Sequence, residues 1–473
     1  MGGVSWGKVS AEKPATIGTL RASGHVRETV KQELRRNLLA RLRSGERLFE
    51  GIVGYDDTVI PQICNAIISG HDLILLGERG QAKSRIMRSL ASLLDPEIPV
   101  IAGCEINDHP YDPICRRCRD LVAEMGEETP VAWLPRERRY GEKLATPDIS
   151  IADLIGEVDP IKVAEGRYLA DELTIHYGLI PRTNRGIFGI NELPDLAERI
   201  QVGLLNIMEE KDVQIRGYRI WLPLDLMVVA SANPEDYTSR GRIITPLKDR
   251  FGSQVRTHYP ATPGEEITIM EAEGTPPPED VQVIVPAFMK EIVAEMTHLA
   301  RRSPHISQSS GVSVRMSIGN YENLAANAVR RAVRLGEEVA VPRIADLRFL
   351  AASTSGRVEI EALDEGKEEQ VLERIQRAAI SSVFNRYFAA GQFENLVSRF
   401  EDGEIVEVGE SMPASAYDRS LGGSPEIAMA VRRLQLPDRP EARASVTEFV
   451  LEGLHLNKRL NKDELDGKAL YRR

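Results

Sequence analysis

Apolar residues occur along this chain either in short, largely unbroken runs or at helical spacing. Short runs occupy 72–76, 186–192 and 225–232, and runs of this length are typical of strands that are buried on both faces. Helical spacing follows at 85–94 and 196–209. Strands that alternate with helices predict an α/β fold with a mainly parallel sheet and helices on both of its faces.

The segments around this α/β region are predicted to be largely helical. Residues 26–43 have apolar side chains at helical spacing and are predicted to form a helix. In 213–222, apolar and polar residues alternate on both sides of Gly217, which predicts a hairpin. We therefore expect four parts: an N-terminal helical segment (1–47), an α/β domain (48–262) with a possible Cys/His insertion near 103–120, an all-α lid (263–355) and a helical C-terminal extension (356–473).

Composition narrows the class of protein. The chain has 473 residues, a net charge of −11 and 42% hydrophobic residues, which is ordinary for a globular protein of two or three domains. We expect no membrane span, because no apolar run approaches the roughly 18–20 residues that a bilayer requires. The first residues also lack the apolar core of a secretory signal. These features predict a cytoplasmic protein, and the acidic balance argues against nucleic acid as a partner.

The first motif with chemical content follows the run at 72–76. It reads GERGQAKS and opens the helix at 85–94. A glycine-containing loop between strand and helix can cradle phosphates with its backbone N–H groups. Lys83 would reach the β- and γ-phosphates of a nucleotide and Ser84 would bind Mg²⁺. The candidate nucleotide-binding residues here are Gly77, Glu78, Arg79, Gly80, Gln81, Ala82, Lys83, Ser84 and Arg85.

Two residues at the end of the strand at 186–192 supply the second half of a nucleotide site. Glu192 would polarise the attacking water as a general base. Asn191 stands where nucleotide hydrolases of this shape carry aspartate, and it would hold Mg²⁺ through water with a carbonyl oxygen and no charge. The alternative is a buried strand that ends in a capped turn.

A cluster of three cysteines and one histidine is a separate candidate site. Cys104, His109, Cys115 and Cys118 could close a tetrahedral zinc site with three thiolates and one imidazole. The alternative is a set of unpaired thiols on an insertion. Cys64 lies apart in an apolar stretch and is predicted to be a buried core thiol.

These motifs together make the chain resemble AAA+ ATPases of the magnesium-chelatase subunit I and MoxR branch, over roughly 48–345. FEGIVGYDD resembles the segment before the adenine pocket, with Ile52 and Val53, and SANPEDY resembles the sensor-1 strand, with Asn233. PLKDRFG resembles the element that carries the arginine finger, which implies that role for Arg250. GVSVRMSIG resembles the start of the sensor-2 helix, which implies that role for Arg315.

Two further segments resemble this branch in particular. Residues 153–186 resemble the chelatase-type insert, and 213–223 resemble the hairpin before sensor 1. The resemblance implies an ATP hydrolase that uses Mg²⁺ and works as a homo-oligomeric ring, expected to be a hexamer because an arginine finger acts on the neighbouring subunit. Asn191 and Ala82 depart from the usual pattern, so we expect an active enzyme with a low rate.

Three functions compete at this point. The first is chaperone-like remodelling of a partner protein with a von Willebrand A domain. The chain contains no D-x-S-x-S stretch, so we expect that domain on a separate chain. The second is the motor subunit of a magnesium or cobalt chelatase. The third is a nucleotide-gated transcriptional regulator, which is disfavoured because the chain has no GAFTGA loop and no clear helix-turn-helix pattern.

Overall fold

The chain folds as two compact units in the computed structural model. The first comprises Met1–Gly77 and Ala82–Thr257, and the second comprises Glu78–Gln81 and His258–Arg473. The structure describes residues 13–159, 172–209, 212–215, 218–233, 242–307, 310–361, 367–465 and 468–473. The four-part division expected from the sequence stays a prediction.

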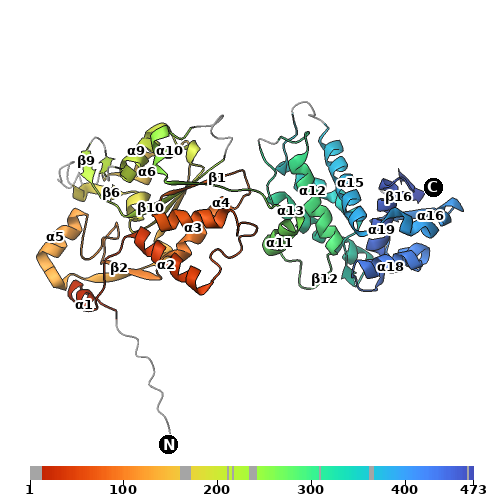
Figure 1. The fold of residues 1–473 in the computed structure, drawn as a ribbon, viewed down its shortest axis with the longest axis horizontal. Helices are drawn as coiled ribbons and strands as arrows, with labels where there is room; N and C mark the ends of the chain where they lie inside the picture. Colours follow the sequence, from red (N-terminus) through yellow and green to blue (C-terminus); the bar gives the residue numbers. More distant parts are fainter. Residues whose placement is uncertain are drawn as a thin grey trace, which may run out of the picture. The chain divides into compact units, whose positions relative to one another are not determined.

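A five-stranded parallel sheet forms the centre of the first unit (Figure 1). Its strands, in spatial order, are β11 (Ser253–Arg256), β1 (Leu73–Leu76), β10 (Leu226–Ala232), β7 (Gly186–Asn191) and β4 (Tyr140–Leu144). The three middle strands are those that the sequence predicts from apolar runs. Their unbroken apolar character follows from burial on both faces, which is usual for strands of a parallel sheet.

Helices cover both faces of this sheet, as the sequence predicts. Side chains that alternate along a strand enter two different cores: Leu73 and Leu75 join one, and Ile74 joins the other. The first core includes α2 (Val30–Ser44), α3 (Val59–Ser69) and α4 (Lys83–Ser89). The second includes α6 (Ile151–Leu154), α8 (Leu179–Arg182), α9 (Glu198–Glu209) and α10 (Thr245–Arg250).

A buried ion pair joins helix α2 to the segment before β4. Arg139 donates to both carboxylate oxygens of Glu33, at 2.7 and 2.6 Å. The two side chains are only 1% and 6% exposed, so each charge depends on the other for its solvation.

Three small antiparallel pairs surround the central sheet. They are β2 (Glu97–Ile101) with β3 (Val131–Pro135), β5 (Gly156–Val158) with β6 (Ile175–Tyr177), and β8 (Asp212–Ile215) with β9 (Tyr218–Trp221). The last pair confirms the hairpin predicted at 213–222. Helix α5 (Arg116–Met125) lies between β2 and β3 in the sequence, and α1 (Ile17–Ala22) packs against Val131 of β3.

The second unit is mainly helical, and one large core extends through most of its helices. Its helices are α11 (Pro263–Glu273), α12 (Ala287–Arg302), α13 (Arg315–Leu335), α14 (Ala351–Thr354), α15 (Glu368–Tyr387), α16 (Glu394–Glu401), α17 (Ala414–Tyr417), α18 (Pro425–Arg433) and α19 (Pro440–Leu456). Residues of the expected lid and of the expected C-terminal extension share that core, for example Phe288 and Phe449, whose rings stack at 4.3 Å.

The second unit also contains strands that the sequence reading did not include. Strands β14 (Val406–Gly409), β16 (Lys468–Arg472) and β15 (Asn461–Leu465) form an antiparallel sheet in that order, and β12 (Gln282–Val283) pairs with β13 (Val339–Ala340). Strands β12 and β13 have only two residues each, and β14, β15 and β16 mix charged with apolar residues, so all five lack the apolar runs that mark the central sheet. Among the described helices, none is both long and apolar enough to cross a bilayer.

Candidate nucleotide site

The loop at 77–84 has the backbone of a tight turn from strand β1 into helix α4. Gly80 has φ +77°, and Ala82, which immediately precedes α4, has φ 55°. Glycine adopts this left-handed region freely, whereas a residue with a Cβ atom pays roughly 1–2 kcal/mol. The loop therefore has the expected shape, and Ala82 holds that shape at an energetic cost.

The tip of the same loop, Glu78–Gln81, groups with the second unit. The Tyr259 hydroxyl donates to the carbonyl of Arg79 at 3.0 Å. A Cβ atom added at Gly80 would lie 2.0 Å from Ser313 Oγ, so only glycine fits there. The Glu78 amide donates to the Gln81 side chain at 3.1 Å.

Lys83 begins a hydrogen-bonded chain of three side chains that come from three separate motifs. Its buried ammonium donates to the carbonyl of Gly77 at 2.5 Å and to Asn233 Oδ1 at 2.8 Å. Asn233 Nδ2 in turn donates to Glu192 Oε2 at 2.8 Å. Asn233 and Glu192 directly follow β10 and β7, which are neighbours, and Gly77 follows β1. All three are thus at the carboxyl edge of the sheet, where parallel α/β proteins bind ligands.

Glu192 itself has an unusual backbone. It adopts φ 57° and ψ 48°, and its amide donates to Ser231 Oγ at 3.2 Å. A non-glycine residue in this region costs energy that the surrounding structure must supply, and such residues cluster at functional sites.

Asn191 uses both ends of its amide. Its carbonyl oxygen accepts hydrogen bonds from Ser84 Oγ at 2.9 Å and from Ser231 Oγ at 3.2 Å. Its amide nitrogen donates to the carboxylate of Glu142. An aspartate at this position could not donate a hydrogen bond to Glu142, because both of its ionised oxygens are acceptors.

Glu142 was not among the residues that the sequence reading selected. It lies on β4 opposite Gly189 of β7, and Arg88 donates to its two oxygens at 2.7 and 2.9 Å. Partial burial raises the pKa of Glu142, but the hydrogen bonds and charge of Arg88, with those of Tyr140 and Asn191, outweigh this and lower it below its ordinary value. A single acidic residue inside a short strand does not form a recognisable sequence motif. Glu142 can be assigned to this site only once the order of the strands in the sheet is known.

Curated relatives of the chain are subunits of magnesium chelatase. ChlI of Nostoc sp. is 29% identical over 262 residues, which cover 54% of this chain and 64% of that protein. The 38 kDa subunit of Rhodobacter capsulatus is 28% identical over 231 residues (48% and 60%). Chloroplastic ChlI-2 of Arabidopsis thaliana is 31% identical over 222 residues (43% and 47%). Over about half of its length, the chain is similar in sequence to magnesium-chelatase subunit I.

The chain spans less than two thirds of the length of those relatives. No family model matches it. Among solved structures, a chain of the complex between subunits BchI and BchD of magnesium chelatase aligns with 21% identity and a TM-score of 0.34, covering 69% of this chain and 98% of that one. NtrX of Brucella abortus aligns with 17% identity and a TM-score of 0.38, covering 73% and 66%.

The remaining candidate residues lie on other elements. Ile52 is buried in the core shared by α2, α3 and α4, and Val53 follows it in the chain. The exposed Arg85 reaches Gly51 of the same segment. Arg250 ends α10 and forms an ion pair with Glu209 at the end of α9. Arg315 begins α13 in the second unit and is exposed.

The three clustered cysteines do converge, but their fourth neighbour is a carboxylate. Cys104, Asp108, Cys115 and Cys118 place one potential ligand atom each within 4.8 Å of the others. His109, which the spacing suggested as the fourth member, is not part of this group. Its Nδ1 accepts a hydrogen bond from the amide of Tyr111 at 3.0 Å, and its ring stacks on His25 at 5.9 Å.

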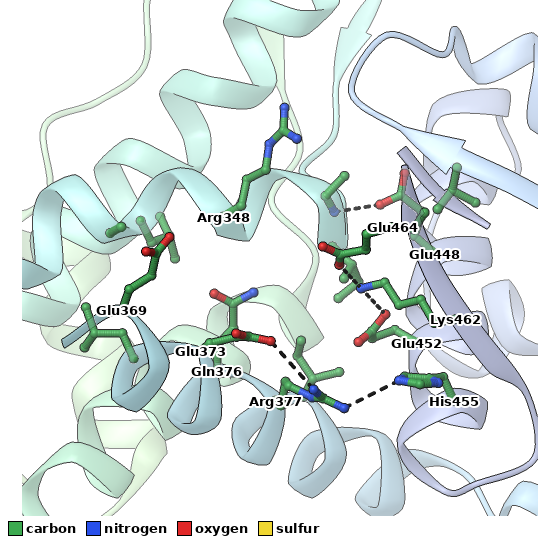
Figure 2. Close-up of a pocket in the computed structure, with 18 of the residues that line it drawn as sticks. Arg348, Glu369, Glu373, Gln376, Arg377, Glu448, Glu452, His455, Lys462 and Glu464 are labelled. Atoms are coloured by element: carbon green, nitrogen blue, oxygen red, sulfur yellow. Dashed lines mark hydrogen bonds and ion pairs between the residues drawn. The ribbon is translucent and has the colours of Figure 1, made fainter. Parts of the chain in front are cut away.

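The second unit contains a cavity of about 990 Å³ with charged walls (Figure 2). Lys462 Nζ lies 3.2 Å from a carboxylate oxygen of Glu452 and 3.0 Å from one of Glu464. Burial lowers the pKa of Lys462, but these two carboxylates outweigh it and raise the pKa above its ordinary value. The positive charge of this ammonium is therefore already balanced by two carboxylates of the cavity wall. It offers an anionic ligand no unpaired charge.

Proposed function

We propose that this chain is an ATP hydrolase that drives remodelling of a partner protein. The observation that carries the proposal is the hydrogen-bonded chain from Lys83 through Asn233 to Glu192. Three groups with complementary roles in phosphoryl transfer meet at the edge of the sheet where the phosphate loop begins.

In this proposal each group has one role. Lys83 exchanges its contact with Asn233 for the β- and γ-phosphates of ATP. Asn233 then orients the attacking water, and Glu192 accepts a proton from it. Arg250 of one subunit and Arg315 stabilise the charge that develops on the γ-phosphate. Since an arginine finger acts across a subunit boundary, we infer a homo-oligomeric ring, with a hexamer as the expected size.

The oxygen atoms around Ser84 suit Mg²⁺, which prefers oxygen ligands and retains several waters. Ser84 Oγ and Asn191 Oδ1 lie 2.9 Å apart, and the Glu142 carboxylate is next to them through the Asn191 amide. When bound, Mg²⁺ neutralises charge on the β- and γ-phosphates. We infer that Glu142, which accepts a hydrogen bond from the Asn191 amide, supplies the negative charge that Asn191 lacks.

We infer the kind of partner protein from the relatives that the chain resembles. The relatives are named as subunits of magnesium chelatase, which supports action on or with another protein. Our first candidate is a chaperone-like remodeller of the MoxR kind that works with a von Willebrand A domain protein. The second candidate is a motor subunit of a magnesium or cobalt chelatase, which the sequence similarity favours.

Steady-state ATP hydrolysis with Mg²⁺ tests the central proposal. We expect Lys83→Ala to lose both nucleotide binding and turnover. Glu192→Gln should keep binding and lose turnover, since it removes only the base. Glu124→Gln, an exposed change on α5, is the control and should match the wild type. Unchanged turnover in Glu192→Gln would refute the assignment of the base.

The same preparation separates the two candidate functions. Insertion of Mg²⁺ or Co²⁺ into a tetrapyrrole by the chain together with its partner would establish the chelatase function. ATP-dependent change in a von Willebrand A partner without such insertion would establish the remodeller.

A further inference from the structure

The side chains of Cys104, Asp108, Cys115 and Cys118, here called the Cys₃Asp cluster, lie at the junction of two elements of the first unit. Cys104 and Asp108 follow strand β2, Cys115 caps the start of α5, and Cys118 is in the first turn of that helix. Asp108 and Cys118 are fully buried, Cys115 is nearly so, and Cys104 is partly exposed. All three thiols are free of disulfide bonds.

The dimensions of the cluster fit a tetrahedral metal site. With zinc–sulfur bonds of about 2.3 Å, the ligand atoms of a tetrahedral zinc site lie about 3.8 Å apart. The four candidate ligand atoms all lie within 4.8 Å of one another. Small adjustments of side-chain torsions would therefore bring them to bonding distance.

Asp108 provides an independent sign that something is bound here. Its Oδ2 accepts a hydrogen bond from the Cys115 amide at 3.0 Å, but its Oδ1 is buried without a hydrogen-bond partner among the described residues. A buried carboxylate oxygen without a partner is costly. A cation bound between the Asp108 carboxylate and the three sulfur atoms would remove that cost.

The backbone around the cluster also favours thiolates. The Asp108 amide donates to Cys104 Sγ at 3.3 Å, and the Cys118 amide donates to Cys115 Sγ at 3.4 Å. Hydrogen bonds of this kind orient metal ligands and stabilise their charge. The second of these bonds forms because Cys115 occupies the N-cap position of α5.

We propose that the Cys₃Asp cluster binds one structural zinc ion. Three thiolates and one carboxylate fill a tetrahedral shell and leave no open position, as is typical of structural rather than catalytic zinc. Thiolate ligands select zinc over magnesium or calcium. The ion joins the end of β2 to the start of α5 and closes the loop between them.

Metal content and its dependence on single residues test this proposal. We expect the full-length chain, purified under reducing conditions, to contain one zinc ion per chain by elemental mass spectrometry. Cys115→Ser and Asp108→Asn should lose zinc or bind it far more weakly. His109→Ala and Cys64→Ser, which leave the cluster intact, are the matched controls and should keep it.

Cobalt substitution checks the ligand set without relying on stability. Co²⁺ added to the metal-free chain should give the thiolate charge-transfer and tetrahedral ligand-field bands expected of a thiolate-rich site. Those bands should persist in His109→Ala and change in Asp108→Asn. Loss in His109→Ala with retention in Asp108→Asn would replace our assignment with a Cys₃His site.

Two results would overturn the proposal outright. One is a wild-type zinc content no higher than that of the Cys115→Ser/Cys118→Ser double variant. The other is a disulfide among the three cysteines in the reduced preparation, seen as a loss of two hydrogens in the intact mass. Because these measurements do not depend on ATP turnover, they stand apart from the test of the proposed function.

Discussion

At the scale of single residues, the exchange of aspartate for Asn191 has a structural counterpart. The Asn191 amide links Ser84 to Glu142, so a carboxylate remains close to the candidate metal position although it comes from the neighbouring strand. Glu142 is held ionised by Arg88. We infer that the negative charge expected at the end of β7 is supplied here from β4.

Exchange of the two side chains tests this inference. We expect Glu142→Gln to raise the Mg²⁺ concentration needed for half-maximal ATP hydrolysis about tenfold, since a change of about 1.4 kcal/mol in binding free energy alters affinity by that factor. Adding Asn191→Asp to Glu142→Gln should restore the Mg²⁺ dependence. Titration of ATPase activity with Mg²⁺ measures both.

The single variant Asn191→Asp is the control for that exchange. It places two carboxylates side by side, which repel each other and favour protonation of one, so it should not improve on the wild type. Identical Mg²⁺ dependence in Glu142→Gln and the wild type would contradict the role of Glu142.

Ala82 supports a second prediction at this scale. Its φ of 55° costs roughly 1–2 kcal/mol, whereas glycine gains roughly 0.5–1 kcal/mol of extra chain entropy in the unfolded state. Ala82→Gly should therefore be neutral to stabilising by up to about 1 kcal/mol. Thermal unfolding measures this, and nucleotide affinity should rise as the loop relaxes.

Ala91→Gly is the matched control for Ala82. Ala91 lies in the short helical segment Leu90–Leu93 that continues α4, where glycine is expected to destabilise by roughly 0.5–1 kcal/mol. Equal destabilisation by both substitutions would show that the left-handed backbone at Ala82 carries no strain.

At the scale of elements, the buried pair of Arg139 and Glu33 holds α2 on the segment before β4. Arg139→Ala leaves the Glu33 carboxylate buried without its partner, and we expect a loss of about 3–5 kcal/mol in the free energy of unfolding of the first unit. Urea unfolding followed by circular dichroism measures the loss.

Two companion variants separate burial from charge. Arg27→Ala breaks an ion pair with Asp112 in which both side chains are about half exposed, and it should cost at most about 1 kcal/mol. Arg139→Met with Glu33→Leu should recover most of the loss, since neither charge remains buried. A large effect of Arg27→Ala would contradict this reasoning.

The same scale explains what the sequence reading predicted and what it missed. The middle strands of the central sheet and the hairpin at 213–222 were predicted from apolar runs and alternation, and the structure confirms them. Strands β14, β15 and β16 were missed because they are short and mix charged with apolar residues. Asp466 and Gly467, a turn-forming pair in the sequence between β15 and β16, were the available signal.

At the scale of the whole molecule, the proposed ring makes each site depend on two subunits. Lys83→Ala and Arg250→Ala should each abolish ATP hydrolysis when pure. Mixed in equal amounts, they should recover a clear fraction of the wild-type rate, because some boundaries then combine an intact Lys83 with an intact Arg250. Steady-state hydrolysis of the mixture measures this.

Mixing each variant with itself at the same total concentration is the control. Recovery in the heterologous mixture alone supports action across a boundary. Complete inactivity of a mixture that light scattering shows to be assembled would place Arg250 outside the neighbouring subunit's site.

The order of residues alone was enough for the class of fold and for most of the candidate nucleotide site. The strands of a parallel sheet that is buried on both faces require unbroken runs of apolar residues. A phosphate loop requires glycines and a lysine at fixed spacing. Both patterns can therefore be recognised in the sequence. Lys83, Asn191 and Glu192 were found this way, whereas Asn233 was found through the resemblance of its segment to a sensor-1 strand.

Other contacts arise from packing of distant segments and leave no local pattern. Glu142 contacts Asn191 only because β4 lies beside β7. Arg139 contacts Glu33 only because α2 packs against the segment before β4. Asp108 joins the cysteines in place of His109 because its carboxylate caps the Cys115 amide while the imidazole stacks on His25. Spacing along a chain limits which residues can meet, but the direction in which each side chain points depends on the folded backbone around it.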